Sequence, residues 1–307
     1  MAYPFEIVIN DAYETIKDEL CGTKAYNVFG LLSLNDFEDN KWRYSKFQKY
    51  IWDNVKETAL SKKERDVLAG EPASALSKSA KNLRITNNDI AGGEIAEIFL
   101  YGIMKDHYGA LPIVPKIFYK QNPNDYAKGA DSVHIVIDYK NNSFSLWLGE
   151  AKFYSDIEND RLDAIVNSVF QTLATDKIRK ENSIILNVGD LDSFDEIGED
   201  MKANIKELLS GETSIDKLKP HLHVPIMILY ESARTKRETS YNLEYVEEMK
   251  AYYKDKLTAY VQKQILKCMN SVANYESITF HVLLFPVPDK DNIVTHFKET
   301  ANALRSI

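Results

Sequence analysis

Two acidic residues and a lysine flank an alternating pattern in the middle of the chain. Asp131 precedes the pattern, and Glu150 and Lys152 follow it. Carboxylates bind divalent ions that activate water, and an ammonium group stabilises anionic charge, so this set suits hydrolysis of a phosphodiester. Such chemistry requires the three side chains to meet. The residues between them must therefore fold the chain back on itself.

These intervening residues predict a β-hairpin. Apolar residues alternate with polar ones over residues 133–137 and again over 144–148, and residues 140–142 interrupt the alternation. A turn centred near Lys140 and Asn141 would put the two acids opposite each other. The lysine two positions after the second acid would share its face, because strand side chains alternate with period two. The hairpin thus predicts a metal-and-water site at its open end.

The order Asp, then Glu-x-Lys, is the pattern of the PD-(D/E)xK nucleases. The tripeptide alone is not specific, because residues 248–250 repeat it and residues 39–41 and 200–202 are Asp versions. Those three copies lie in helical or loop-like contexts in which no strand brings a second acid alongside. The context therefore selects the copy at 150–152.

The composition is that of an ordinary soluble protein. The 307 residues are 44% hydrophobic and 27% charged, enough to bury a large core. We find no basic N-terminal region followed by an apolar run, and no apolar stretch long enough to cross a membrane. Two cysteines far apart support neither a disulfide scaffold nor a thiolate metal site. We therefore expect a cytoplasmic protein without a membrane partner.

The periodicity predicts an α/β fold with a restriction-endonuclease-like PD-(D/E)xK core, a mixed central sheet flanked by helices. We expect a mainly helical N-terminal region over 1–85 and the nuclease domain over 86–307. The core elements follow the order helix, strand, strand, strand, helix, strand. They are a helix to about 107, a strand over 111–119 restricted to an edge by its prolines, the hairpin, a helix over 156–180 and a short strand over 183–188. Two further strands, 224–230 and 278–285, and helices over 243–268 and 292–304 complete the chain.

The predicted helix before the hairpin supplies two more acids. Glu97, or alternatively Glu94, would complete the site from that helix by binding a second ion or a metal-bound water. Asp131 and Glu150 are the predicted ligands of Mg²⁺ or Mn²⁺, and the carbonyl of Ala151 is placed to join them. Gln171, in the helix after the hairpin, is a further candidate for the same pocket.

The lysine of the motif has two conceivable roles. As a general base, Lys152 would need its pKa, about 10.4 in water, to fall close to neutral. Orienting the attacking water and stabilising anionic charge needs no such change, so we favour that role.

The charge balance argues against strong binding of DNA by the chain alone. The formal net charge is −8, which repels a polyanion at long range. Lys78, Lys81 and Arg84 fall three residues apart and are the candidate contacts to the nucleic-acid backbone, although a solvated face explains them equally well.

Three motifs in the same order resemble the HamA family, the nuclease subunits of the Hachiman anti-phage defence system of bacteria. The motifs are 93–101, with Glu97, 128–134, with Asp131, and 146–154, with the Glu-x-Lys. The resemblance covers the core, about 90 to 190. It implies a DNase that works with a DNA helicase subunit, HamB, and destroys DNA upon infection. The Gly93-x-x-x-Glu97 spacing is also similar to that of Holliday-junction resolvases and favours Glu97 over Glu94.

Two other readings stay open. A nuclease fold can serve only as a catalytically silent partner-binding subunit, although the intact Asp131, Glu150 and Lys152 speak against this. The same site would also suit an RNase.

Overall fold

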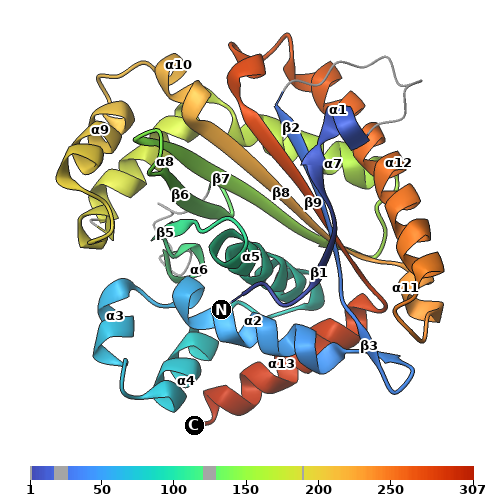
Figure 1. Cartoon of the computed structure of the whole chain (residues 1–307). Helices are drawn as coiled ribbons and strands as arrows, with labels where there is room; N and C mark the ends of the chain where they lie inside the picture. Colours follow the sequence, from blue (N-terminus) through green and yellow to red (C-terminus); the bar gives the residue numbers. More distant parts are fainter. Residues whose placement is uncertain (1, 17–26, 120–128, 189) are drawn as a thin grey trace.

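The strands of the protein assemble around one mixed sheet. The computed structural model describes residues 2–16, 27–119, 129–188 and 190–307. Within these ranges seven strands form one sheet in the order β1-β2-β9-β8-β7-β6-β5 (Figure 1). Its strands are β1 (Glu6–Ala12), β2 (Val28–Leu34), β5 (Leu111–Val114), β6 (Ser132–Asp138), β7 (Ser143–Tyr154), β8 (Leu222–Glu231) and β9 (Thr279–Val287). A small separate hairpin pairs β3 (Phe37–Glu38) with β4 (Lys41–Trp42).

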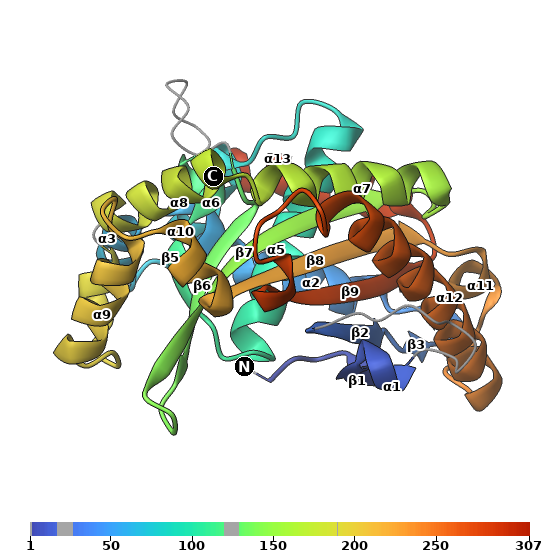
Figure 2. The same ribbon diagram turned by 90° about the horizontal axis from the view of Figure 1, so that it is seen from above.

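Helices cover both faces of the sheet (Figures 1 and 2). One face packs on α2 (Tyr44–Ala59), α5 (Asn88–Asp106) and α13 (Lys290–Arg305), and the other packs on α7 (Asn159–Thr172), α8 (Thr175–Val188) and α12 (Leu243–Cys268). The remaining helices are α1 (Tyr13–Ile16), α3 (Lys62–Val67), α4 (Pro72–Asn82), α6 (Lys116–Tyr119), α9 (Glu199–Leu209), α10 (Ile215–Leu218) and α11 (Ala233–Arg237). None of the described helices is both long and apolar enough to span a bilayer.

The strands with nearly continuous apolar sequences lie in the middle of the sheet, and β5 lies at an edge. β8 and β9 lie in the middle, run parallel to β7 and are buried on both faces, which explains their nearly continuous apolar sequences. β5 is an edge strand, as the prolines of that segment predict. It is shorter than the predicted strand over 111–119, because residues 116–119 form α6. The predicted strands at 224–230 and 278–285 and the helices at 243–268 and 292–304 are confirmed within a few residues.

One predicted strand is wrong. Residues 183–188 form the end of α8, and the predicted helix over 156–180 is two helices separated by Leu173 and Ala174. A short apolar run does not by itself distinguish a buried strand from a buried helix. Here Ile184 and Ile185 lie on the buried face of α8, whereas Leu186 is 38% exposed. The strand beside β7 is instead β8. From α5 to β8 the order is therefore helix, strand, strand, strand, helices, strand, except that the short helix α6 interrupts it between β5 and β6.

The N-terminal region is more than a helical lobe. β1 and β2 extend the main sheet, because β1 pairs with β2 and β2 runs parallel to β9. The helices of this region also join the shared core, since Phe47 of α2 packs against Phe99 of α5 with ring centroids 5.4 Å apart. The prediction of a mainly helical region over 1–85 is therefore incomplete, because it omits two strands of the central sheet.

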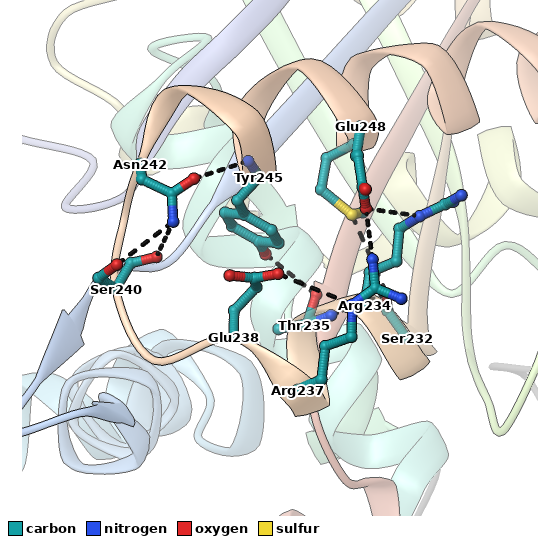
Figure 3. A network of polar contacts seen from close by, with 10 residues as sticks. Ser232, Arg234, Thr235, Arg237, Glu238, Ser240, Asn242, Tyr245 and Glu248 are labelled. Carbon is teal, nitrogen blue, oxygen red and sulfur yellow. Dashed lines mark hydrogen bonds and ion pairs between the residues drawn. The ribbon is translucent and has the colours of Figure 1, made fainter.

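A polar network fixes the start of α12 over the end of β8 (Figure 3). The side chain of Asn242 caps α12 by accepting the N–H of Tyr245 at 2.9 Å, and the Tyr245 hydroxyl lies 3.0 Å from that of Thr235. Glu248 accepts hydrogen bonds from Arg234 at 3.0 Å and Arg237 at 2.8 Å. These contacts join α11 to α12. They leave the carboxylate of Glu248 committed to two arginines, away from any metal site.

One histidine of the central hairpin is buried in the core. His134 of β6 is only 1% exposed, and its ring packs on that of Tyr101 from α5 with 5.0 Å between centroids. Burial lowers the pKa of His134 from its ordinary 6.5 to about 3. The ring is therefore neutral in the folded protein at neutral pH.

We expect a His134→Leu variant to lose less stability in acid than the wild type. Below about pH 6.5 the unfolded chain binds a proton at His134 that the folded chain excludes, so acidification favours unfolding until the folded pKa is reached. This single group removes about 1 kcal/mol of stability between about pH 6.5 and 5.5. Urea unfolding of both proteins at the two pH values measures the difference. Equal losses in the two proteins would contradict the role of His134.

Candidate metal and phosphodiester site

The central hairpin has the predicted register. Ser132 of β6 lies opposite Gly149 of β7, and Asp138 lies opposite Ser143. The turn is closed by the side chain of Asp138, which accepts the N–H of Lys140 at 3.0 Å, and by Asn142, whose φ of 47° is left-handed. The closed end projects from the body of the protein (Figure 2), while the open end reaches the middle of the molecule.

Asp131 continues this register one residue beyond β6. Its main-chain N–H donates to the carbonyl of Gly149 at 2.7 Å. Its Oδ2 accepts the N–H of Ala151 at 3.0 Å and lies 3.4 Å from Nζ of Lys152. The carboxylate is therefore held against β7. Since the N–H and C=O of a strand residue point to the same side, the carbonyl of Ala151 is also directed towards Asp131.

Glu150 and Lys152 share the sheet face that packs on α7. Nζ of Lys152 forms an ion pair with Oε1 of Glu150, and the hydroxyl of Ser168 from α7 donates to the same oxygen. The side chain of Glu150 is only 5% exposed, that of Asp131 16% and that of Lys152 28%. Two carboxylates and one ammonium group thus converge at the open end of the hairpin.

The electrostatics of this group favour a cation. Burial raises the pKa of Glu150, and the neighbouring charge of Asp131 raises it further, against the opposing effects of Lys152 and Ser168. Burial alone would lower the pKa of Lys152, but Asp131 and Glu150 outweigh burial, so its pKa is raised. Lys152 is therefore held protonated. This charge state suits the stabilisation of anions and opposes a role as general base.

The three residues line one open cleft of about 320 Å³ between the hairpin and the helices α7 and α8. Gln171 lies at this cleft, as predicted. The sequence analysis missed Ser168 and Thr172 on α7 and Lys177 on α8, which also line it. Ser168 lies one helical turn before Gln171, so helical spacing from Gln171 would have found it, and Thr172 lies one turn after Ser168. No local pattern distinguishes Lys177.

The two candidate acids of α5 lie on the other side of the sheet. α5 packs against the face of β7 that carries Gly149, where a Cβ would lie only 2.8 Å from Cδ2 of Leu100. Glu94 is buried and Glu97 half-buried. None of the described residues that line the cleft comes from α5. The roles of Glu94 and Glu97 stay a prediction, and part of the adjoining motif, Lys128, lies outside the described residues.

The residues predicted to contact the nucleic-acid backbone also lie away from the cleft. Lys78 and Lys81 are on α4, which packs on α2 and α13 in the layer opposite α7 and α8. Arg84 lies beyond the end of α4, so the three cations do not share one helix face. Lys78 pairs with Glu64 at 2.9 Å. Contact between these residues and nucleic acid remains a prediction.

The donors at the cleft fit a small divalent ion. Among the described residues no three His, Cys, Asp or Glu side chains form a closed metal cluster. Magnesium is commonly bound by only one or two carboxylates, with water and substrate phosphate oxygens filling the other positions. Asp131 and Glu150 provide two such carboxylates beside the carbonyl of Ala151. Hard oxygen donors of this kind select Mg²⁺ or Mn²⁺ over softer metals.

Comparison with known proteins agrees with the three motifs. The sequence profile of the HamA family matches residues 10–301 of the 307, which include the end of β1, all of β2, the hairpin and the cleft. A search of curated proteins gives no significant match. The chain thus belongs to the HamA family, and this membership implies an anti-phage defence role within a Hachiman system that has a partner.

Proposed function

We propose that the protein is a metal-dependent DNase, the nuclease effector of its defence system, and that its core is of the PD-(D/E)xK type. The convergence of Asp131, Glu150 and Lys152 at the open end of one hairpin carries this proposal. The element order from α5 to β8 supports it. We further propose that a helicase subunit, HamB, controls the activity.

The charged and amide side chains of the cleft have distinct parts in the proposed hydrolysis. Asp131 and Glu150 would hold the ion, and Ala151 would offer its carbonyl. When bound, Mg²⁺ lowers the pKa of its water and neutralises charge at the phosphate. The protonated Lys152 would orient the water and stabilise the charge that develops on the phosphate oxygens. Gln171 and Lys177 also line the cleft and would contact the substrate backbone.

We expect the protein, together with its partner, to degrade labelled DNA in the presence of Mg²⁺ or Mn²⁺ and to stop when EDTA is added. Two carboxylates without an ion repel an incoming phosphate, so metal removal should reduce the rate at least about 10³-fold. Gel analysis of labelled DNA with each ion and with EDTA measures this. Addition of excess Mg²⁺ after EDTA should restore the rate.

The same assay separates the alternatives. Labelled RNA is tested in parallel, and preferential cleavage of RNA would replace the DNase proposal with an RNase. If neither nucleic acid is cut with any ion, with or without the partner, the protein is a catalytically silent subunit. Cleavage that persists in EDTA would contradict the metal site.

A further inference from the structure

A buried ion pair lies directly behind the cleft. Nζ of Lys116, the first residue of α6, is 2.6 Å from Oε2 of Glu181 in the middle of α8. The two side chains are 3% and 2% exposed. Removing both charges from water is costly, and an apolar pair of similar size is often equally stable. The pair therefore calls for an explanation other than stability.

The second oxygen of Glu181 binds the backbone next to the site. Oε1 accepts the N–H of Ala130 at 2.9 Å, and Ala130 immediately precedes Asp131. The carboxylate reaches this position only because residue 129 is glycine, since a Cβ there would lie 1.8 Å from Oε1. Glu181 thus uses one oxygen for Lys116 and the other for the start of the hairpin.

The backbone around Asp131 is consequently held from two sides. The N–H of Ala130 is bound by Glu181, and the N–H of Asp131 is bound by the carbonyl of Gly149. The pair also connects the two ends of the segment from Lys116 to Ala130 to one helix, α8.

We infer that Glu181, with Lys116 as its counter-ion, is a positioning residue that sets the place of the Asp131 carboxylate relative to Glu150. The inference rests on the proposed metal site, and it assigns to this buried pair the geometry of one of its two ligands. The ion pair with Lys116 holds the carboxylate of Glu181 in place beside the N–H of Ala130.

Binding of Mn²⁺ to the full chain, followed by the electron paramagnetic resonance signal of the free ion, tests the inference without nuclease activity. We expect the double variant Lys116→Met with Glu181→Leu to fold and to bind Mn²⁺ about 10- to 100-fold more weakly, the usual effect of losing a residue that orients a ligand. Lys116→Met with Glu181→Gln should recover most of the affinity, because the glutamine oxygen still accepts the N–H of Ala130.

A matched control removes an ion pair of similar length elsewhere. Lys105 and Glu57 lie 2.9 Å apart in the layer of α2 and α5, and Lys105→Met with Glu57→Gln should leave Mn²⁺ binding unchanged. If the Leu variant does not fold, Gly129→Ala provides the second test, since its methyl group displaces Glu181 and should weaken binding similarly.

The outcomes distinguish this inference from the function on which it rests. If Asp131→Asn weakens Mn²⁺ binding but the folded pair variants bind as the wild type does, the inference is overturned and the metal site stands. If the wild type and Asp131→Asn bind Mn²⁺ equally poorly, the metal site and the inference fall together. Weaker binding by the Leu variant with recovery by the Gln variant supports both.

Discussion

Replacing Glu150 with glutamine should reduce DNA cleavage by at least about 10³-fold, which corresponds to about 4 kcal/mol of lost transition-state stabilisation. Glutamine has the same shape but no charge to hold an ion beside Asp131. Lys152→Ala should cause a comparable loss by removing the cation that faces the substrate phosphate. Single-turnover cleavage of labelled DNA by the complex with the partner measures both rates.

The same substitution should leave the metal-free fold nearly as stable as the wild type. Since burial and Asp131 raise the pKa of Glu150, the ionised carboxylate opposes folding at neutral pH, and its neutralisation offsets the loss of its contact with Lys152. Asp163→Asn is the matched control, because Asp163 lies on α7 in a surface ion pair with Lys263 at 2.8 Å that is worth under about 1 kcal/mol. A well-folded Glu150→Gln protein that cleaves at the wild-type rate would eliminate the site.

The hairpin was predictable because all its information is local. Alternation over residues 133–137 and 144–148 sets the faces, and the turn at Lys140 and Asn141 sets the register. Together these specify which residue lies opposite Asp131. The convergence of Asp131, Glu150 and Lys152 follows from the register alone, without knowledge of the rest of the fold.

Features that depend on distant partners were not predictable in the same way. β2 is a strand because it runs parallel to β9, about 250 residues later in the chain, and no local pattern names that partner. Residues 183–188 carry a strand-like apolar run but belong to α8, because the place beside β7 is filled by β8. Lys177 and Glu181 reach the site region only through the packing of α8.

The side of the sheet on which α5 lies could not be predicted from the sequence. Periodicity identified the helix and the face that carries Glu94 and Glu97, but not the side of the sheet on which the helix lies. The face of β7 that packs on α5 carries Ala151 and Phe153, while Glu150 points to the opposite side. A role for Glu97 as a third acid would therefore need its carboxylate to reach the ion from the opposite face of the sheet, and a Glu97→Gln variant in the Mn²⁺ assay tests this role directly.

The chain on its own should bind DNA weakly and with a shallow dependence on salt. The described cations at the cleft are Lys152 and Lys177, and Lys152 is already engaged by two carboxylates. With a net charge of −8, the chain can neutralise only a few phosphates. We expect the plot of log affinity against log salt to have a slope shallower than about −3.

The proposed helicase partner should change both the affinity and the slope, because a chain with few phosphate contacts of its own must be carried to DNA. Fluorescence anisotropy of labelled duplex DNA at about 50 to 200 mM salt, with and without the helicase, measures the slopes, and Glu150→Gln prevents cleavage during binding. A triple variant in which Lys78, Lys81 and Arg84 become alanine tests the α4 region separately, since each lost phosphate contact makes the slope about one unit shallower. Tight, steeply salt-dependent binding by the isolated chain would show that local charge overrides the net charge. It would also remove the physical reason for a carrier, because the chain would then reach DNA without assistance.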